Sequence, residues 1–255
     1  MKKFYFNHIP KTAGTSIIEW FCHYFDADKR CQAWNPEAFM KLSDSDVDQY
    51  DFFAGHLHKL PRSRLRCGFQ ELAVVRSPRQ HLLSCLAYEA KVNPDPGLSS
   101  MEEQLQRQIE ILNWNIENAK TSAPIFNYQA RYLLGMKVDT RLEFPANAKE
   151  GALDYLRKCT YVGVTENLQE VLDLVCYHRR WPYQRLSFRR NTSSSNKLSS
   201  MLDIQKFMPL LHTDQALYDY ARARLKSDLA AAFGHEIDPA ARQRVIEQRC
   251  PSVAL

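Results

Sequence analysis

The sequence predicts an α/β fold, a P-loop-like arrangement of three layers with a central, mostly parallel sheet flanked by helices. Three observations lead to this prediction. Four short apolar runs have the length and composition of strands, and they alternate with amphipathic helical patterns. Two polar loops rich in hydroxyl and basic residues each follow one of these runs directly. The chain also lacks internal repeats and any linker that would divide it.

The expected strands are short apolar segments spread over the first two thirds of the chain: 4–9, 51–54, 72–75 and 161–164. Their alternation with helical segments is typical of a mostly parallel sheet with helices on both faces. Ligands of such sheets bind at the carboxyl ends of the strands. Both polar loops are expected at that edge, because each directly follows a strand.

Five helices are expected: 15–25, 79–90, 101–118, 148–159 and 168–180. In the first, four apolar residues recur at the i, i+3, i+4 spacing of one helix face: Ile17, Ile18, Phe21 and Phe25. The last helix is expected to begin at Thr165 or Asn167 as N-cap, with Glu170 within reach to complete a capping box.

Length and composition indicate a single domain over 1–255. With 45% hydrophobic and 25% charged residues, the chain can bury one large core, and its longest polar low-complexity stretch is only 191–196.

The net charge of +5 and the pI near 8.8 are lower than those of a polybasic protein that binds nucleic acid. An anionic cofactor explains this charge as well as nucleic acid does, and no nucleic-acid partner is expected.

The cysteines and the hydropathy of the chain indicate the cellular compartment of the protein. The seven cysteines are odd in number and form no C-x-x-C pair, which indicates neither a disulfide framework nor a zinc site. No apolar run approaches the roughly 18 residues that a membrane span requires, and no signal peptide precedes the first strand. We therefore expect a soluble, cytoplasmic protein without a transmembrane segment.

The first polar loop, 8–16, reads H-I-P-K-T-A-G-T-S between an apolar strand and a helical pattern. Such a loop turns backbone N–H groups toward one point at the positive end of a helix, a favourable place for a phosphate. The charge of Lys11 and the hydroxyls of Thr12, Thr15 and Ser16 add to it. Because Lys precedes the single Gly, the order differs from the Walker pattern G-x-x-x-x-G-K-[ST]. A nucleoside triphosphate is therefore not the first expectation.

The second loop follows the apolar strand 72–75 and has the pattern R-S-P-x-x-x-x-x-S. Arg76 stands at the end of the strand, and Ser84 lies two turns into the helix that follows. A guanidinium and a hydroxyl in these places can hold one phosphate together, the former through a bidentate charge-assisted contact. The sequence thus predicts two anion sites.

Together these two stretches resemble the sulfotransferases that use 3′-phosphoadenosine 5′-phosphosulfate (PAPS). They are most similar to the group that includes heparan sulfate 2-O-sulfotransferase and bacterial carbohydrate sulfotransferases. Weaker likenesses follow in the same order along the chain: 54–56, 127–135, 162–166 and 214–220. The pattern departs at His81, where the group often has another Arg, and at Ala54, where the heparan sulfate enzyme has a second His.

The resemblance implies a PAPS-dependent sulfotransferase that releases 3′-phosphoadenosine 5′-phosphate (PAP) and requires no metal. It assigns the 5′-phosphosulfate to the first loop and the 3′-phosphate to Arg76 with Ser84. The first-loop residues are Lys11, Thr12, Ala13, Gly14, Thr15 and Ser16. The acceptor is expected to be a hydroxylated small molecule or saccharide, most simply a carbohydrate or glycan-like metabolite.

Two catalytic residues are expected. Lys11 would place a cation near the leaving phosphate. His56 would act as the base for the acceptor proton, because an imidazole has a pKa of about 6.5 and the Gly-His pair of the related group aligns here. His58 competes for that role, whereas His8 is expected to pack locally. Glu166 is either a site residue or a helix N-terminal charge.

Several alternatives stay open. The rival functions are an ATP-dependent small-molecule kinase and a nucleotide-binding module without turnover. Acceptor specificity is expected in the loops 91–100, 124–129 and 186–197; in the last, Arg189, Arg190 and Lys197 either face an anion or are solvated. The four tryptophans are expected in the core or at a rim, and none stands out as a platform: Trp20, Trp34, Trp114 and Trp181. The sequence favours no oligomeric state.

Overall fold

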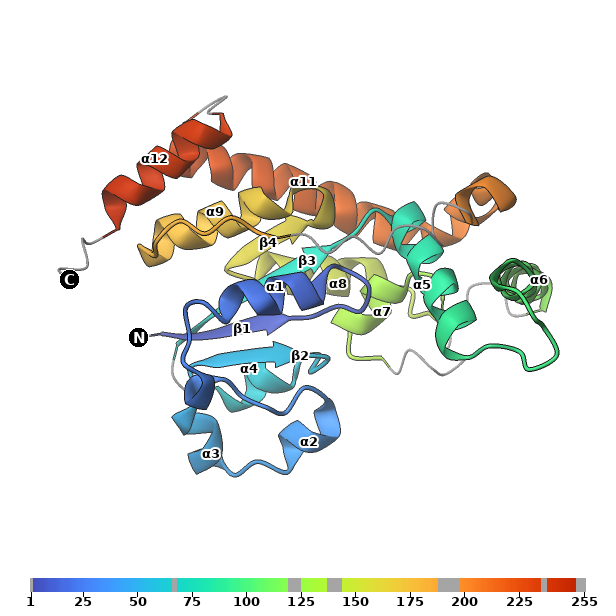
Figure 1. The fold of residues 1–255 in the computed structure, drawn as a ribbon, viewed down its shortest axis with the longest axis horizontal. Coiled ribbons are helices and arrows are strands. Elements are labelled where there is room, and N and C mark those ends of the chain that lie inside the picture. The colour runs from blue at the N-terminus through green and yellow to red at the C-terminus, as the bar shows by residue number, and fades with distance from the viewer. Residues whose placement is uncertain are drawn as a thin grey trace.

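The structure, a computed structural model, describes residues 2–65, 68–118, 125–136, 144–187, 198–234 and 238–250. Its centre is a four-stranded sheet with strand order β2-β1-β3-β4, in which every neighbouring pair is parallel. The strands are β1 (Lys3–Asn7), β2 (Phe52–Gly55), β3 (Phe69–Val75) and β4 (Tyr161–Val164). Helices cover both faces of the sheet (Figure 1), which confirms the expected α/β class.

The five helices expected from the sequence are all present. The bounds of α6 (Met101–Asn118) are as expected, and at least one end is shifted in α1 (Gly14–Phe21), α5 (Pro78–Val92), α8 (Ala148–Arg157) and α9 (Leu168–Arg179). The remaining named helices are shorter or lie near the end of the chain: α2 (Pro36–Met40), α3 (Asp44–Gln49), α4 (Leu60–Arg64), α7 (Tyr128–Leu133), α11 (His212–Phe233) and α12 (Pro239–Arg249). The described residues also include three 3₁₀ segments: η1 (Ala27–Lys29), η3 (Thr165–Asn167) and η4 (Ile204–Leu211).

Two local expectations are wrong. Helix α1 ends at Phe21, so Phe25 reaches the core from the segment after the helix, and Trp20 rather than Ile18 is buried with Ile17 and Phe21 on the inner face. The capping box at α9 does not form either, because the Asn167 side chain donates to Glu170 and accepts nothing from the helix.

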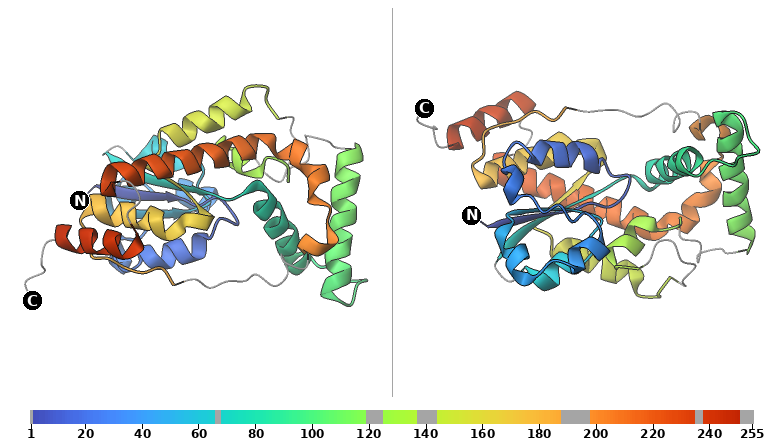
Figure 2. Two further views of the ribbon diagram at one scale, coloured as in Figure 1. Left: turned by 90° about the horizontal axis from the view of Figure 1, so that it is seen from above. Right: turned by 60° about the horizontal axis from the view of Figure 1, so that its bottom comes forward.

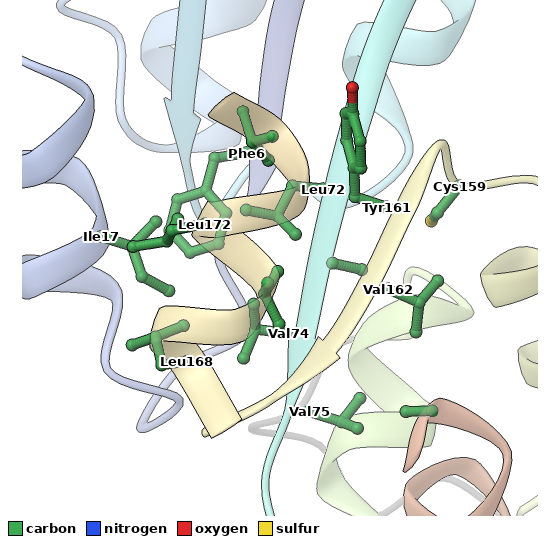
Figure 3. Close-up of a cluster of buried hydrophobic side chains, with 14 of the residues drawn as sticks. Phe6, Ile17, Leu72, Val74, Val75, Cys159, Tyr161, Val162, Leu168 and Leu172 are labelled. Atoms are coloured by element: carbon green, nitrogen blue, oxygen red, sulfur yellow. The ribbon is translucent and has the colours of Figure 1, made fainter. Parts of the chain in front are cut away.

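The largest hydrophobic core lies between the sheet and its covering helices. On one side of the strands, Leu72 and Val74 of β3 pack with Ile17 of α1 and with α9, as Figure 3 shows. Val75 and Val162 point to the opposite side, which α7, α8 and α11 cover. Because both faces are covered, β1 is buried at all five positions.

A second hydrophobic cluster lies beyond the carboxyl edge of the sheet. It is built from α5, α6 and η4, with Leu86, Leu105 and Phe207 among its fully or nearly fully buried members. In Figure 2 these elements form an end of the molecule opposite the amino terminus. A third cluster, around Tyr5 and Phe53, packs against α2, α3 and α4.

The carboxyl ends of three strands meet at one edge. Asn7, the last residue of β1, lies opposite Gly55 of β2 and Ala73 of β3. The segments that follow β1, β2 and β3 therefore begin side by side, as the parallel sheet predicted. Along the described part of the chain, no helix is both long and apolar enough to cross a bilayer.

Candidate functional site

The loop after β1 has an unusual backbone. Lys11 and Ala13 have φ angles of 67° and 63°, the left-handed region that non-glycine residues rarely adopt. Each such residue costs roughly 1–2 kcal/mol, and the surrounding structure must hold it in place. Left-handed residues within a turn direct successive N–H groups into a concave anion-binding nest. The loop therefore contains two left-handed residues of the kind from which such nests are built.

The start of α1 contributes more donors to the same place. The first intrahelical hydrogen bond runs from the Ile17 N–H to the Ala13 carbonyl at 3.2 Å. The N–H groups of Gly14, Thr15 and Ser16 precede it and have no carbonyl acceptor within the helix. They lie at the positive end of the helix dipole, where an anion is stabilised.

The hydroxyls of the loop divide into two kinds. Thr12 is fully buried, and its hydroxyl donates to the Ile9 carbonyl at 2.8 Å, so this side chain closes the loop from inside. Thr15 is exposed and Ser16 is half-buried at the first turn of α1. The sequence alone did not separate these roles.

Gly14 is required by close packing. It is buried, and a Cβ atom at this position would overlap the imidazole of His8. The ring of His8 stacks on Phe6 on the strand side at a centroid distance of 5.5 Å. The single glycine of the loop thus lets the end of β1 and the start of α1 approach each other.

Arg76, directly after β3, reaches the first loop. Its guanidinium donates to the Lys11 carbonyl at 3.1 Å, which brings the two predicted anion-binding segments together. Its backbone is held by the Gln129 side chain, which accepts from the Arg76 N–H at 2.8 Å and donates to the Arg76 carbonyl at 2.9 Å. Glu166 accepts from the N–H of Ser77 at 3.2 Å and so fixes the following turn.

Gln129 is held in turn by a reciprocal cap between α7 and α11. The carboxylate of Asp214 accepts from the N–H groups of Gln129 and Ala130 at 3.2 and 2.8 Å. The Asn127 side chain accepts from the N–H groups of Thr213 and Asp214 at 3.1 and 3.2 Å. Complete burial raises the pKa of Asp214 to about 6. Two sequence stretches that matched the resemblance weakly thus support the position of Arg76.

Helix α5 presents one face to the first loop. His81 Nε2 lies 2.9 Å from the Pro10 carbonyl, and the Lys11 ammonium lies 3.9 Å from the centroid of the Tyr88 ring. Ser84 is three residues after His81 and four before Tyr88, so it lies on the same helix face between two residues that contact the loop. Its side chain is half-buried.

The site is electropositive. Burial is the main cause of the lowered pKa of Lys11, and the nearby charge of Arg76 lowers it further. Burial likewise lowers the pKa of Arg76, although Glu166 acts in the opposite direction. Two partly buried cations side by side repel each other and favour a bound anion.

His56 lies at the carboxyl end of β2 and has a defined orientation. Its Nδ1 is 2.9 Å from the His8 carbonyl, which can only accept, so Nδ1 carries the proton and Nε2 keeps its lone pair. The ring packs against the His8 ring with centroids 4.5 Å apart. Burial lowers the pKa of His56, and burial, reinforced by His56 and Lys11, lowers the pKa of His8 to about 3. Both rings are therefore neutral at pH 7.

His58 occupies a different environment. Its Nδ1 lies 3.1 Å from the Tyr132 carbonyl, and its ring packs on the Tyr132 ring at a centroid distance of 4.2 Å. Of the two histidines that the sequence left in competition, His56 contacts His8, the first residue of the loop after β1, whereas His58 contacts Tyr132 of α7.

Comparisons of the chain with protein-family models, with curated proteins and with solved structures find no match. In the stretches that the structure describes, no group of three or more His, Cys, Asp or Glu residues is placed to hold a metal ion.

Sequence reasoning missed three residues that lie at this candidate site. Gln129 is in a stretch to which the sequence assigns no role, and Tyr88 could have been found from its i+4 spacing to Ser84. No local signal marked Trp34, whose ring lies near that of His56. His8 packs locally, as expected, against Phe6 and His56. The basic residues Arg189, Arg190 and Lys197 lie outside the described residues.

Proposed function

We propose that this chain is a PAPS-dependent sulfotransferase that moves a sulfuryl group to a hydroxyl of a carbohydrate or glycan-like acceptor. The observation that carries the proposal is the contact between the Arg76 guanidinium and the Lys11 carbonyl at 3.1 Å. PAPS has two separate anionic groups on one adenosine, and this contact brings two anion-binding segments close enough to serve one ligand. The likeness of both segments to the known motifs supports the same ligand.

In this proposal each end of the nucleotide has its own binding segment. The 5′-phosphosulfate lies against the N–H groups at the start of α1 and against Lys11, while Arg76 and Ser84 hold the 3′-phosphate. Lys11, Arg76 and Ser84 are half-buried, which supports these two binding roles. Partial desolvation strengthens a charge-assisted contact, while the site stays open to the ligand.

The proposed reaction is an in-line displacement at sulfur. The acceptor oxygen forms a bond to sulfur, and the bond between sulfur and the bridging phosphate oxygen breaks. The electron pair of the broken bond goes to that oxygen, whose developing charge Lys11 stabilises, and PAP leaves. The acceptor proton passes to Nε2 of His56, the nitrogen that the contact of Nδ1 with the His8 carbonyl leaves available. The proposal includes a cytoplasmic location.

Thermal unfolding tests the nucleotide assignment against a kinase. PAP without magnesium at about 100 times its dissociation constant is expected to add roughly 2.7 kcal/mol of stability, which raises Tm by about 5–10 °C in a chain of this size. ATP with magnesium is expected to give a smaller rise, and Lys11→Ala is expected to lose most of the PAP effect.

A larger rise with ATP and magnesium than with PAP would contradict the proposal and favour a kinase. A rise with PAP but no transfer of sulfate from PAPS to any member of a broad acceptor panel would instead indicate a nucleotide-binding module without turnover.

A further inference from the structure

Trp34 is a large apolar residue that the fold leaves exposed. Its relative accessibility is 62%, the highest among the exposed large hydrophobic residues of the described chain. Trp20 and Trp181, by contrast, are buried in the main core. One exposed aromatic residue is ordinary on a protein surface, so its position relative to the site decides whether it has a role.

The backbone around Trp34 is fixed to the edge of the sheet. The Trp34 carbonyl accepts from the His56 N–H at 2.8 Å, and the Cys31 N–H donates to the Phe52 carbonyl at 2.8 Å. Gly55 has a φ angle of 146°, and a Cβ atom there would overlap the backbone of Trp34. The segment that carries Trp34 therefore lies directly against β2.

The neighbours of Trp34 in the sequence are also anchored. Ala33 is buried, and the Asn35 side chain caps α2 by accepting from the Ala38 N–H at 2.9 Å. The exposed indole thus projects from a segment that is held on both sides. Its ring lies 6.4 Å from the ring of His56, at an interplanar angle of 74°.

We propose that the indole of Trp34 is the surface on which the acceptor lies while its hydroxyl reaches His56, and that this acceptor is an extended saccharide. The inference rests on the proposed function. A pyranose ring has an apolar C–H face that can stack on an indole, while the hydroxyls around its rim stay free to reach a base and water. An indole buries a large area and has only two side-chain torsions, so it provides affinity with little loss of conformational entropy.

The exposure of Trp34 favours an extended saccharide over a small aromatic alcohol. Small-molecule sites are concave and bury most of the ligand surface. An indole with more than half of its surface exposed covers only one face of a ring, which suits a chain that lies across the molecule and makes further contacts along its length.

The test uses Trp34→Ala and Trp34→Phe, with Trp114→Ala as matched control, because Trp114 is also exposed, at 46%, but lies on α6. Chitin and hyaluronan tetrasaccharides are titrated while tryptophan fluorescence is recorded. We expect at least one of the two to change the fluorescence of the wild type and of Trp114→Ala, and neither to change that of Trp34→Ala.

Steady-state sulfation of the responding tetrasaccharide completes the test. Trp34→Ala is expected to raise the acceptor KM roughly tenfold with kcat within about twofold, and Trp34→Phe is expected to lie between it and the wild type. An unchanged KM in Trp34→Ala would overturn the inference. So would a fluorescence response to 2-naphthol without a response to either tetrasaccharide, or no response to any of the three.

The Tm rise with PAP, measured in the same variants, separates the two proposals. A normal rise in Trp34→Ala shows that this variant is folded and binds nucleotide, so a negative result with the tetrasaccharides would then overturn the Trp34 inference alone. No rise in the wild type would overturn the proposed function itself.

Discussion

His56 is oriented by backbone atoms, which makes its role testable by side-chain removal. Its backbone N–H donates to the Trp34 carbonyl, and its Nδ1 lies against the His8 carbonyl. Neither contact therefore depends on another titrating side chain. The fold thus fixes the tautomer, and burial keeps the ring neutral. A neutral imidazole with a free Nε2 is the form that can accept a proton.

Replacing His56 by Ala is expected to lower kcat about 100-fold or more, because the acceptor proton loses its base. PAP binding is expected to stay within about twofold, since His56 lies outside the nucleotide segments. In the wild type, kcat/KM is expected to be flat from pH 7 to 8 and to fall only below pH 6.5. The reason is that burial lowers the pKa of His56, so protonation removes the base at a more acidic pH. Stopped assays from pH 5 to 8 measure both effects.

His58→Ala serves as the matched control for this histidine. Its ring contacts Tyr132 rather than the loop after β1, so kcat is expected to change by less than about fivefold. A wild-type rate in His56→Ala, or an unchanged acid limb in that variant, would remove His56 from the mechanism.

At the scale of elements, the junction between β1 and α1 depends on a close contact that only glycine permits. Gly14→Ala is expected to lower the free energy of unfolding by about 1–3 kcal/mol, because the added methyl group displaces the His8 ring. The displaced ring also disturbs the N–H groups that we propose hold the anion, so PAP affinity is expected to fall. Urea unfolding and calorimetry measure the two effects.

Gly68→Ala is the matched control, since a Cβ atom there meets nothing within 4 Å. Its unfolding free energy is expected to stay within about 0.5 kcal/mol of the wild type. Equal effects of the two substitutions would show that the contact between Gly14 and His8 does not govern the loop.

Local patterns predicted all four strands and five of the helices that the structure describes, but not the long helix α11. The bounds of α6 and β4 agree with the sequence, because amphipathic and apolar periodicity needs no tertiary information. The predicted end of α1 was wrong because Phe25 is buried in the core although it lies after the helix. Its spacing from Phe21 made it look like one more residue of the apolar helix face. The capping box at α9 was wrong because the Asn167 side chain pairs with Glu170 instead of the backbone.

At the scale of the whole molecule, the sequence predicted the sheet edge at which the segments of the candidate site begin, but not how these segments contact one another. A parallel sheet places the ends of β1 and β3 side by side, which follows from topology. The hydrogen bond between Gln129 and Arg76 and the position of Trp34 beside His56 depend on contacts between residues far apart in the sequence. No local period encodes such contacts.

The central claim is that one nucleotide is held at both ends by the loop after β1 and by the segment after β3. Calorimetry with PAP and with adenosine 5′-monophosphate, which lacks the 3′-phosphate, tests it in the wild type and in Arg76→Ala. We predict that the wild type binds PAP about 100-fold more tightly and that Arg76→Ala loses most of this preference. Equal binding of the two nucleotides by the wild type, or a preference for PAP that survives Arg76→Ala, would contradict the account.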